Sequence, residues 1–330
     1  MKAFEYERAR DAGHAMTLAS GREDAMYLAG GTNLVDLMKL GVLRPTALVD
    51  VRDLPFGEID HHDDGSVLIG ATVRNSDLAG DHGIRERFPM LSESLLAGAS
   101  GQLRSVATTG GNLLQRTRCV YFQDVTKPCN KRSPGSGCPA IEGHHRDLGM
   151  LGTSDHCVAT NPSDMAVALV ALDAVVHVRR VGGRTEHISV HDFYHLPGDT
   201  PHRETVLEHG DLVTHVEVPP PQARAVMRYR KVRDRASYAF AVVSVAVVAS
   251  RDTDGRLAEL KLGLGGLAPR PWRARRFEQA LAGGPVTDDR LRVALAAEFA
   301  TARPLPRNEF KLDLARDAVV ATVRELTRGR

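Results

Sequence analysis

Short apolar runs alternate with helical periodicities along the first third of the chain. Residues 25–29 form one apolar run, and a Gly-Gly pair and a segment at 32–38 with one apolar helical face follow it. Further apolar runs at 47–51 and 66–71 predict two more strands. This order predicts an α/β arrangement in which a glycine turn joins the first strand to its helix.

Two patterns stand out in the middle of the chain. Ser163 or Asp164 can cap a helix whose apolar positions recur through 165–172. Two strand-like runs flank Gly182-Gly183 and predict a β-hairpin.

The last third reads as a second unit. Residues 211–218 predict a strand, and Pro219-Pro220-Pro221 after it is the best candidate linker. Strands are expected beyond it at 226–232, 240–249 and 259–263. Because the stretch 312–326 keeps one helical face apolar, we expect a mixed sheet packed against a small helical bundle.

Length and charge limit the function classes. A chain of 330 residues is too long for one ordinary core, so two or three domains are expected. The net charge of +2 argues against a dedicated nucleic-acid binder. No apolar run approaches the ~20 residues that span a bilayer, so no membrane insertion is expected. The charged start of the chain lacks the apolar core of a signal peptide, which predicts no export signal of its own.

All four cysteines, Cys119, Cys129, Cys138 and Cys157, fall in one segment, separated by 9, 8 and 18 residues. The part at 127–139 is too rich in proline, glycine and charge for a helix or a regular strand. A long irregular loop in a compact chain needs something to hold it together. Four thiolates that converge on one metal centre would do so.

Three interpretations of these cysteines remain open on spacing alone. Two disulfides would imply an oxidising compartment. Structural zinc usually uses C-x2-4-C pairs, which are absent here. An iron–sulfur cluster can be held by four thiolates with variable spacing. His144, His145 and His156 lie near enough in sequence to replace a thiolate, although we interpret the first two as exposed loop histidines.

Two glycine turns are candidates for phosphate or ribose binding. One is Gly30-Gly31, and the other lies at 107–113, with the sequence Ala-Thr-Thr-Gly-Gly-Asn-Leu. Glycine lets a backbone approach a ligand closely, and hydroxyls and free N–H groups suit its oxygens. Each turn also fits an ordinary connection. Asp164 is likewise either a helix cap or an acceptor for a cofactor hydroxyl.

Two other sequence patterns are weaker evidence for a binding site. Residues 263–268 fit G-x-G-x-x-A, but Pro269 follows and no βαβ unit surrounds them, so we reject a dinucleotide site. Five of the eight residues at 228–235 are basic, and strand alternation places Arg230 and Lys231 on opposite faces. A bound anionic cofactor or a partner subunit explains this run better than nucleic acid, and a solvated edge is the simpler alternative.

Four segments in order, at 28–34, 107–112, 163–165 and 229–233, resemble the FAD-binding middle subunit of the molybdenum hydroxylases. That family includes xanthine dehydrogenase, carbon monoxide dehydrogenase and aldehyde oxidoreductases. The resemblance covers essentially the whole chain. Residues 115–138 and 231–240 are most similar to middle subunits of bacterial periplasmic aldehyde oxidoreductases, in which a cysteine insertion binds a [4Fe–4S] cluster.

The resemblance implies an α+β protein. Residues 1–221 would form a two-subdomain α/β domain of the vanillyl-alcohol-oxidase type that binds FAD, with an iron–sulfur insertion at 115–158. Residues 222–330 would form an α+β C-terminal domain with a sheet and a helical bundle.

The resemblance also implies a division of labour in a heterotrimer. A large molybdenum-cofactor subunit oxidises the aldehyde, and a small subunit with two [2Fe–2S] clusters passes electrons to this flavin. This chain would hand them to an external acceptor other than NAD, so it serves an oxidoreductase without an aldehyde site of its own. Because it carries no signal, a partner with a twin-arginine signal would take it to the periplasm; the alternative is the cytoplasm.

The resemblance assigns the site residues as well. FAD would contact Leu28, Ala29, Gly30, Gly31, Thr32, Asn33, Leu34, Thr108, Gly111, Asn112, Asp164, Val213 and either Arg230 or Lys231. The cluster would be bound by Cys119, Cys129, Cys138 and Cys157. Two alternatives stay open: a zinc-stabilised scaffold without flavin, and a flavin oxidase of related fold with its own substrate site.

Overall fold

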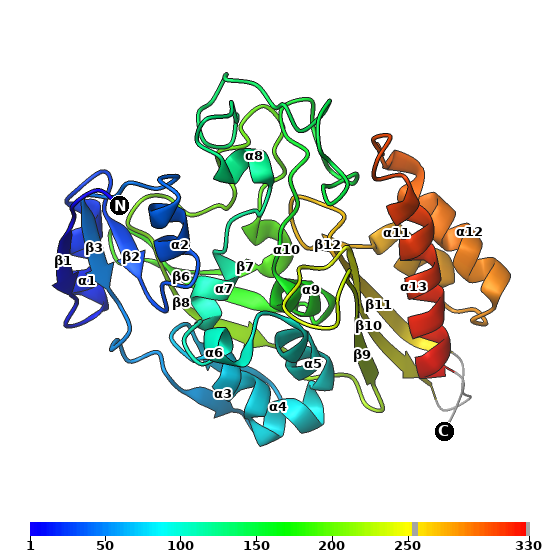
Figure 1. The fold of residues 1–330 in the computed structure, drawn as a ribbon. Coiled ribbons are helices and arrows are strands. Elements are labelled where there is room, and N and C mark those ends of the chain that lie inside the picture. Colours follow the sequence, from blue (N-terminus) through cyan, green and yellow to red (C-terminus); the bar gives the residue numbers. More distant parts are fainter. Residues whose placement is uncertain (253–256, 328–330) are drawn as a thin grey trace.

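Three sheets, each with its own helices, follow one another along the chain (Figure 1). The computed structural model describes residues 1–252 and 257–327. A mixed helix-and-sheet fold with an α/β first part and an α+β last part was predicted, and it is confirmed.

The first sheet is small and parallel, with the order β1-β3-β2. Its elements are β1 (Glu5–Arg8), α1 (Ala12–Ser20), β2 (Met26–Leu28), α2 (Leu34–Lys39) and β3 (Ala47–Asp50). The predicted strand, glycine turn and helix are therefore present as β2 and α2. Parallel neighbours require crossover connections, and α1 and α2 lie on these connections.

The second sheet is antiparallel, with the order β4-β5-β8-β6-β7. Its strands are β4 (Ile59–His61), β5 (Val67–Gly70), β6 (Val175–Arg179), β7 (Thr185–Ser189) and β8 (Leu212–Val218). The predicted hairpin is confirmed as β6 and β7. Gly182 and Gly183 have φ of 96° and 90° in its turn, a conformation that glycine adopts without strain.

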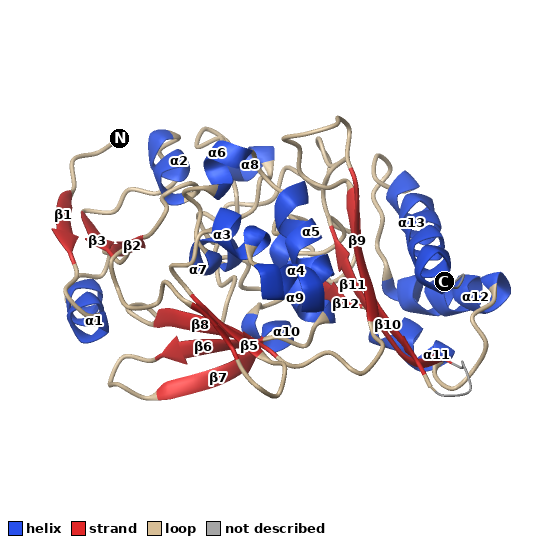
Figure 2. Ribbon diagram, turned by 90° about the horizontal axis from the view of Figure 1, so that it is seen from below, coloured by secondary structure: helices blue, strands red, loops and turns tan. Residues whose placement is uncertain are grey.

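Helices fill the chain between β5 and β6 and cover one face of this sheet (Figure 2). They are α3 (Asn75–Gly80), α4 (His82–Arg87), α5 (Pro89–Ala97), α6 (Gly101–Arg104), α7 (Thr109–Leu113), α8 (Val120–Gln123) and α9 (Asp164–Ala171), with α10 (Val190–Phe193) after β7. Helix α9 is buried over its whole length because it packs between the second and third sheets. The Ser163 hydroxyl caps it by accepting a hydrogen bond from Ala166 N at 3.0 Å.

The third sheet has the order β12-β11-β10-β9 and is antiparallel throughout. Its elements are β9 (Val226–Val232), β10 (Val243–Arg251), β11 (Leu257–Gly265), β12 (Trp272–Arg273), α11 (Arg275–Leu281), α12 (Asp288–Glu298), the 3-10 turn η1 (Phe299–Thr301) and α13 (Phe310–Thr327). The expected mixed sheet is wrong, because alternating apolar positions do not encode strand direction. The expected helical cover is present on the side away from α9 (Figure 2).

The segment between α8 and α9 is irregular, as its composition predicts, and lies at the top of Figure 1. It is bound to the third region by backbone hydrogen bonds from Met150 N to Leu267 O (2.8 Å) and from Asn161 N to Ala268 O (2.9 Å). The fully buried Lys311 of α13 donates to Leu148 O at 2.9 Å. The segment is therefore held by residues that are distant in sequence.

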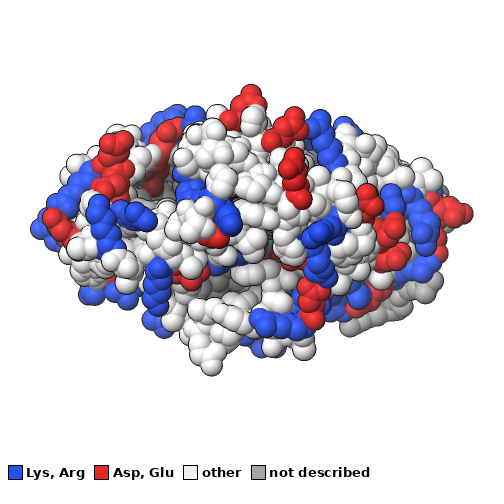
Figure 3. Space-filling view, turned by 45° about the horizontal axis from the view of Figure 1, so that its top comes forward, with Lys and Arg blue, Asp and Glu red and all other residues white. Residues whose placement is uncertain are grey.

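The surface charge, the helix lengths and the glycine run at 263–268 bear on function classes considered from the sequence. On the face in Figure 3, basic and acidic side chains are intermingled toward both ends of the molecule. Within the described residues, every helix is too short or too polar to cross a membrane. The glycine run at 263–268 begins inside β11 instead of in a strand–helix turn.

Candidate functional site

A cavity of about 550 Å³ lies where the three regions meet. Its lining comes from residues 31–39 after β2, residues 75–118 around α5 to α7, the start of α9, and residues 231–240 from β9 onward. Small-molecule sites typically enclose about 300–1,000 Å³ at such junctions. The cavity is thus a candidate binding site of ordinary size.

The first glycine turn forms one wall. Gly31 lines the cavity with φ of 70°, together with Thr32 and Asn33. A Cβ on Gly30 would lie 2.1 Å from Val106 O, so only glycine lets the two glycine turns touch. The other residues of the predicted segment flank this wall in the chain; they are Leu28, Ala29 and Leu34.

The second glycine turn is a helix start. Residues Thr109–Leu113 form α7, because the Thr108 hydroxyl caps it by accepting a hydrogen bond from Gly111 N at 3.3 Å. Gly111 and Asn112 line the cavity. The Asn112 side-chain oxygen accepts from Ser163 Oγ at 2.7 Å, which ties α7 to the start of α9.

A buried ion pair forms another wall. The cap of α9 is Ser163, which leaves the Asp164 carboxylate free to accept from Lys231 Nζ (2.8 Å) and Tyr229 Oη (2.5 Å). Only 3% of the Lys231 side chain is exposed. Burial and the neighbouring Asp164 carboxylate raise the pKa of Tyr229, so its hydroxyl stays a donor. Asp164 and Lys231 both line the cavity.

Two predicted residues lie elsewhere. Arg230 donates to Thr322 Oγ1 at 2.8 Å and pairs with Glu325 on α13, so Lys231 is the member of the pair that reaches the cavity. Val213 lies in β8 opposite Val178, in the core of the second region. Of the predicted flavin contacts, the lining contributed by the described residues lacks Leu28, Ala29, Gly30, Leu34, Thr108, Val213 and Arg230.

Sequence reasoning missed much of the lining. The missed polar and aromatic residues are Asp36, Lys39, Asn75, Ser94, Arg104, Gln115, Arg118, Arg235, Tyr238 and Phe240. None of them was predicted as a cofactor contact, although Gln115, Arg118, Arg235, Tyr238 and Phe240 fall in the segments that carry the closer resemblance. The Arg118 guanidinium, for example, pairs with Asp36 (3.2 Å) and stacks over the Phe240 ring at 5.0 Å, a contact between three distant segments.

Three buried polar atoms at this cavity have no hydrogen-bond partner among the described residues. They are Asn33 Nδ2, Asn75 Oδ1 and Arg118 Nε. A buried polar group without a partner costs about 1–3 kcal/mol, so proteins rarely leave several in one place. The three residues line the cavity, although these particular atoms are buried behind its surface.

The four cysteines meet at a second, much smaller cavity whose lining comes entirely from residues 117–159. All four are free thiols, so the disulfide interpretation finds no support in the structure. Among the described residues, no three of the sulfur atoms lie within 4.8 Å of one another. A single tetrahedral zinc ion with Zn–S bonds of about 2.3 Å would need sulfurs about 3.8 Å apart. The described sulfur atoms are therefore not arranged as a preformed single-zinc site.

Burial dominates the chemistry of these thiols. Together with smaller contributions from the neighbouring Cys129 and Cys157, it raises the pKa of Cys119 to about 11. The pKa of Cys157 is also raised by burial, while the Lys131 ammonium opposes that shift. Lys131 is buried and donates to Pro201 O at 2.9 Å. Burial therefore favours the neutral thiol form of Cys119 and Cys157.

The nearby histidines play different parts. His145 was expected to be exposed, and this is wrong: it is buried, with Nδ1 donating to Ala140 O at 3.1 Å and Nε2 accepting from Arg307 N at 3.1 Å. His144 is exposed, as expected. His156 lines the cysteine cavity and lies 3.4 Å from Asp199.

The two cavities are neighbours. Arg118 lines the large one and Cys119 lines the cysteine cavity, so consecutive residues join them. A third hollow of about 240 Å³ touches both, because its lining includes Arg118, Cys119 and Asp164. The two sites are therefore parts of one functional region.

Comparison with known proteins places this architecture. Residues 2–221 match the family described as FAD binding domain in molybdopterin dehydrogenase, and residues 198–326 match the CO dehydrogenase flavoprotein C-terminal domain. The chain is 50% identical to the aldehyde oxidoreductase FAD-binding subunit PaoB of Escherichia coli (strain K12), covering 98% of each chain. It is 25% identical to the carbon monoxide dehydrogenase medium chain of Afipia carboxidovorans (strain OM5), covering 92% of this chain and 88% of that one.

Solved structures agree on the fold. Reconstituted CO dehydrogenase from Oligotropha carboxidovorans aligns with a TM-score of 0.77 at 23% identity, over 99% of this chain and 98% of that one. Quinoline 2-oxidoreductase from Pseudomonas putida 86 aligns with a TM-score of 0.75 at 20% identity, over 100% and 99%. The resemblance inferred from four sequence segments is confirmed: this chain belongs to the molybdenum hydroxylase family as one of its FAD-binding subunits.

Proposed function

We propose that this chain is the FAD- and [4Fe–4S]-binding electron-transfer subunit of a heterotrimeric, molybdenum-dependent aldehyde oxidoreductase. The observation that carries the proposal is the large cavity, lined by both glycine turns and the Asp164–Lys231 pair, directly beside a small cavity lined by all four cysteines. The 50% identity to a subunit named for FAD binding in an aldehyde oxidoreductase supports the reaction class. The partners would be a large molybdenum-cofactor subunit and a small subunit with two [2Fe–2S] clusters.

The cavity residues fit FAD by their chemistry. Gly31, Thr32 and Gly111 leave backbone close to the ligand, where N–H groups and a hydroxyl can bind phosphate oxygens. The Asp164 carboxylate, held in place by Lys231, can accept a hydrogen bond from a ribose or ribityl hydroxyl. When bound, the flavin exchanges electrons singly or in pairs, and the protein supplies its orientation.

The cysteine segment fits an iron–sulfur cluster. Its backbone is ordered by its own side chains, because Asn130 Oδ1 accepts from Gly137 N (2.7 Å) and Ser136 Oγ accepts from Cys129 N (3.0 Å). Four thiolates complete the ligand set of a [4Fe–4S] cluster, which supplies one-electron exchange. The Lys131 ammonium near Cys157 would offset part of its negative charge.

Metal and flavin analysis of the purified complex tests both cofactors. We expect one FAD and about four iron atoms per copy of this chain beyond those of the small subunit. Flavin absorption bands should overlie a broad iron–sulfur shoulder. About one zinc and no such iron would favour the zinc-stabilised scaffold. Aldehyde-independent oxidation of another substrate by this chain alone would favour the flavin oxidase.

The outgoing electrons should go to an acceptor other than NAD, such as a ferredoxin-like protein, a quinone-type dye or oxygen. The support is the additional one-electron centre proposed beside the flavin, which hydride transfer to NAD would not need. Steady-state assays of the complex with an aldehyde test this. NAD reduction as fast as reduction of one-electron dyes would contradict it.

We also propose that the chain reaches the periplasm together with a partner that carries the export signal. Folded cofactor proteins cross the membrane as assembled units, so an unsignalled subunit can be carried. Cell fractionation with and without the small subunit tests this. Equal periplasmic amounts in both strains would contradict carriage by that partner, and a wholly cytoplasmic complex would favour the alternative location.

A further inference from the structure

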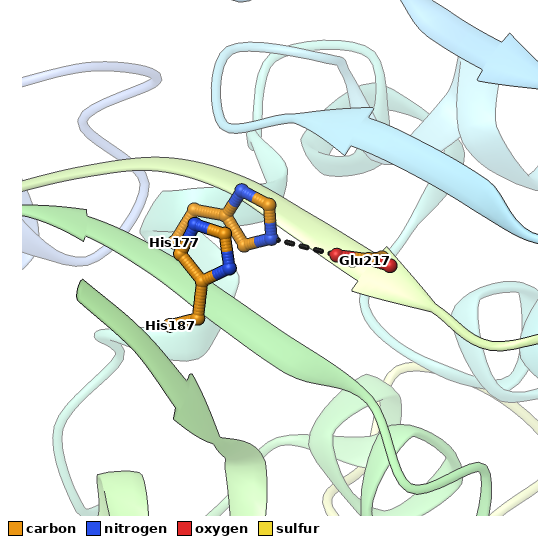
Figure 4. A group of neighbouring side chains, drawn as sticks. All are labelled: His177, His187 and Glu217. Atoms are coloured by element: carbon orange, nitrogen blue, oxygen red, sulfur yellow. Dashed lines mark hydrogen bonds and ion pairs between the residues drawn. The ribbon is translucent and has the colours of Figure 1, made fainter. Parts of the chain in front are cut away.

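The outer face of the second sheet carries a row of histidines outside the flavin and cysteine sites. His177 on β6 lies directly opposite His187 on β7 and opposite His215 on β8. Glu217 follows two positions after His215, so it points to the same side of β8. Figure 4 shows His177, His187 and Glu217 gathered over these three strands.

The geometry of this group is tight. His177 Nε2 lies 2.9 Å from Glu217 Oε2. The rings of His177 and His187 stack with centroids 3.9 Å apart and planes within 8°. One ligand atom from each of the three residues lies within 4.8 Å of the others. Two imidazoles and one carboxylate thus converge on a space the size of one ion.

The group faces solvent from a rigid base. Val176 and Val178 on either side of His177 are fully buried, so the strand is fixed and His177 projects outward. His187 is exposed, and the Glu217 side chain is 38% exposed. Among the described residues, the ring nitrogens of His187 have no hydrogen-bond partner. The hydrogen bond to Glu217 explains the orientation of the His177 ring. It does not explain why a second imidazole, that of His187, is stacked against this ring.

We propose that His177, His187 and Glu217 form a binding site for a divalent transition-metal ion, with zinc as the best match. Imidazole nitrogen and carboxylate oxygen are zinc ligands, whereas calcium and magnesium prefer sites built from oxygen alone. Three protein ligands leave a fourth position, which opens to solvent at the exposed His187.

Only small movements separate this arrangement from a bound state. Zinc bonds of about 2.0–2.2 Å place neighbouring ligand atoms about 3.3 Å apart in a tetrahedron. His177 Nε2 and Glu217 Oε2 lie somewhat closer than this, at 2.9 Å, so they would move slightly apart as the ion replaces their hydrogen bond. The His187 ring must turn out of the stack so that its lone pair converges on the same point. Because His187 lies exposed on the edge strand β7, this turn meets little packing resistance.

Burial lowers the pKa of His177, and the adjacent His187 adds to this shift, although the Glu217 carboxylate opposes it. The shift favours the neutral form of the His177 ring, which is the form that binds a metal. A bound ion would tie the edge strand β7 to the central strands β6 and β8, so zinc should raise the unfolding temperature of the protein.

Equilibrium dialysis of the purified full-length protein in its native assembly against zinc chloride, followed by metal analysis, tests the site. The variants are His187→Ala and Glu217→Gln, with His82→Ala as the matched control. His82 is a surface histidine on α4, with 87% of its side chain exposed. Any zinc bound elsewhere, including at the cysteines, contributes equally to all four proteins.

We expect the wild type and His82→Ala to bind one more zinc per chain than His187→Ala. Glu217→Gln should bind this ion on the order of tenfold more weakly or worse, because the amide is a poorer ligand. Zinc should raise the unfolding temperature of the wild type more than that of His187→Ala. An unchanged FAD content shows that each variant is folded. Equal zinc stoichiometry and affinity in the wild type, His187→Ala and Glu217→Gln would overturn the proposal.

Discussion

The large cavity and the cysteine cavity lie side by side but are assembled differently. The lining of the large cavity comes from segments spread between residues 31 and 240, while the cysteine cavity is lined only by residues 117–159. The large cavity also leaves three buried polar atoms without partners among the described residues, whereas the cysteine segment satisfies much of its backbone with its own side chains.

The difference separates two ways of making a cofactor site. A local segment brings its candidate ligands together over a short stretch of chain, so they can be recognised from clustered residues. A site built at a junction exists only when all regions are in place, and a ligand bound there stabilises the folded chain. Variants at the two sites should therefore change one cofactor and spare the other.

The largest effect is expected for Cys157→Ser. Serine replaces one of four thiolates, so iron at this site should fall to near zero. FAD content should stay close to that of the wild type, because no cysteine lines the large cavity. Iron and flavin stoichiometry of the purified protein measure this. Lys127→Ala, a change of an exposed residue in the same segment, is the control and should leave both cofactors unchanged. Iron retained in Cys157→Ser would contradict the cluster assignment.

Gly31→Val should have the opposite pattern. Gly31 has φ of 70°, and a Cβ there would lie 3.1 Å from Val35 Cγ2, so a branched side chain strains the turn at the cavity wall. We expect FAD affinity to fall by on the order of a hundredfold, equivalent to about 3 kcal/mol, with iron retained. Gly80→Val is the control, since nothing lies within 4 Å of a Cβ at Gly80. Full, tightly bound flavin in Gly31→Val would show that this turn does not hold the cofactor.

Neighbouring residues on β9 sharpen the comparison. Lys231→Met leaves the Asp164 carboxylate buried without its ammonium, which should lower the free energy of unfolding by about 3–5 kcal/mol and weaken FAD binding. Arg230→Met removes a partly exposed pair with Glu325, which should cost about 1 kcal/mol or less and leave FAD in place. Urea unfolding with flavin fluorescence distinguishes them. Equal effects on FAD would contradict the orientation of β9.

An effect that is spread over a range of pH concerns Lys311, which joins the cysteine segment to α13. Burial lowers the pKa of its ammonium from 10.5 to about 8. Between pH 8 and 10.5 the unfolded chain therefore binds more protons than the folded one, and this residue makes the unfolding free energy rise with pH, by up to about 3 kcal/mol. The unfolding free energy of the wild type should therefore rise across that window relative to that of Lys311→Met, because methionine does not titrate. A constant difference from pH 7.5 to 10 would show that the ammonium is not destabilised by burial.

The sequence predicts the gathering of the four cysteines better than the lining of the large cavity, for a physical reason. The cysteines are close in sequence, and their residue type is rare enough that their clustering is noticed directly. Arg118 and Phe240 form part of the large cavity only because folding brings distant segments together, and neither was predicted as a cofactor contact. Alternation predicted that Arg230 and Lys231 face opposite sides, but it does not say which side is inward.

Local chemistry also explains two differences in secondary structure. The turn at 107–113 contains Gly-Gly, which disfavours a helix, yet the Thr108 cap and tertiary packing make α7. The third sheet is antiparallel although the apolar pattern of its strands fits either direction. The fold class and the β6–β7 hairpin depend on local signals and were predictable.

The backbone bonds from the cysteine segment to Leu267 and Ala268, and the Lys311 bond to Leu148, bear on the order of events during synthesis. A ribosome makes the chain from its N-terminus at about 5–20 residues per second, so all four cysteines emerge several seconds before these partners exist. During that interval the nascent segment has its thiols but not its outer support. A cluster inserted before release of the chain would have to be protected by another protein. The cysteine segment can therefore reach its final packing only after the C-terminal part of the chain has been synthesised.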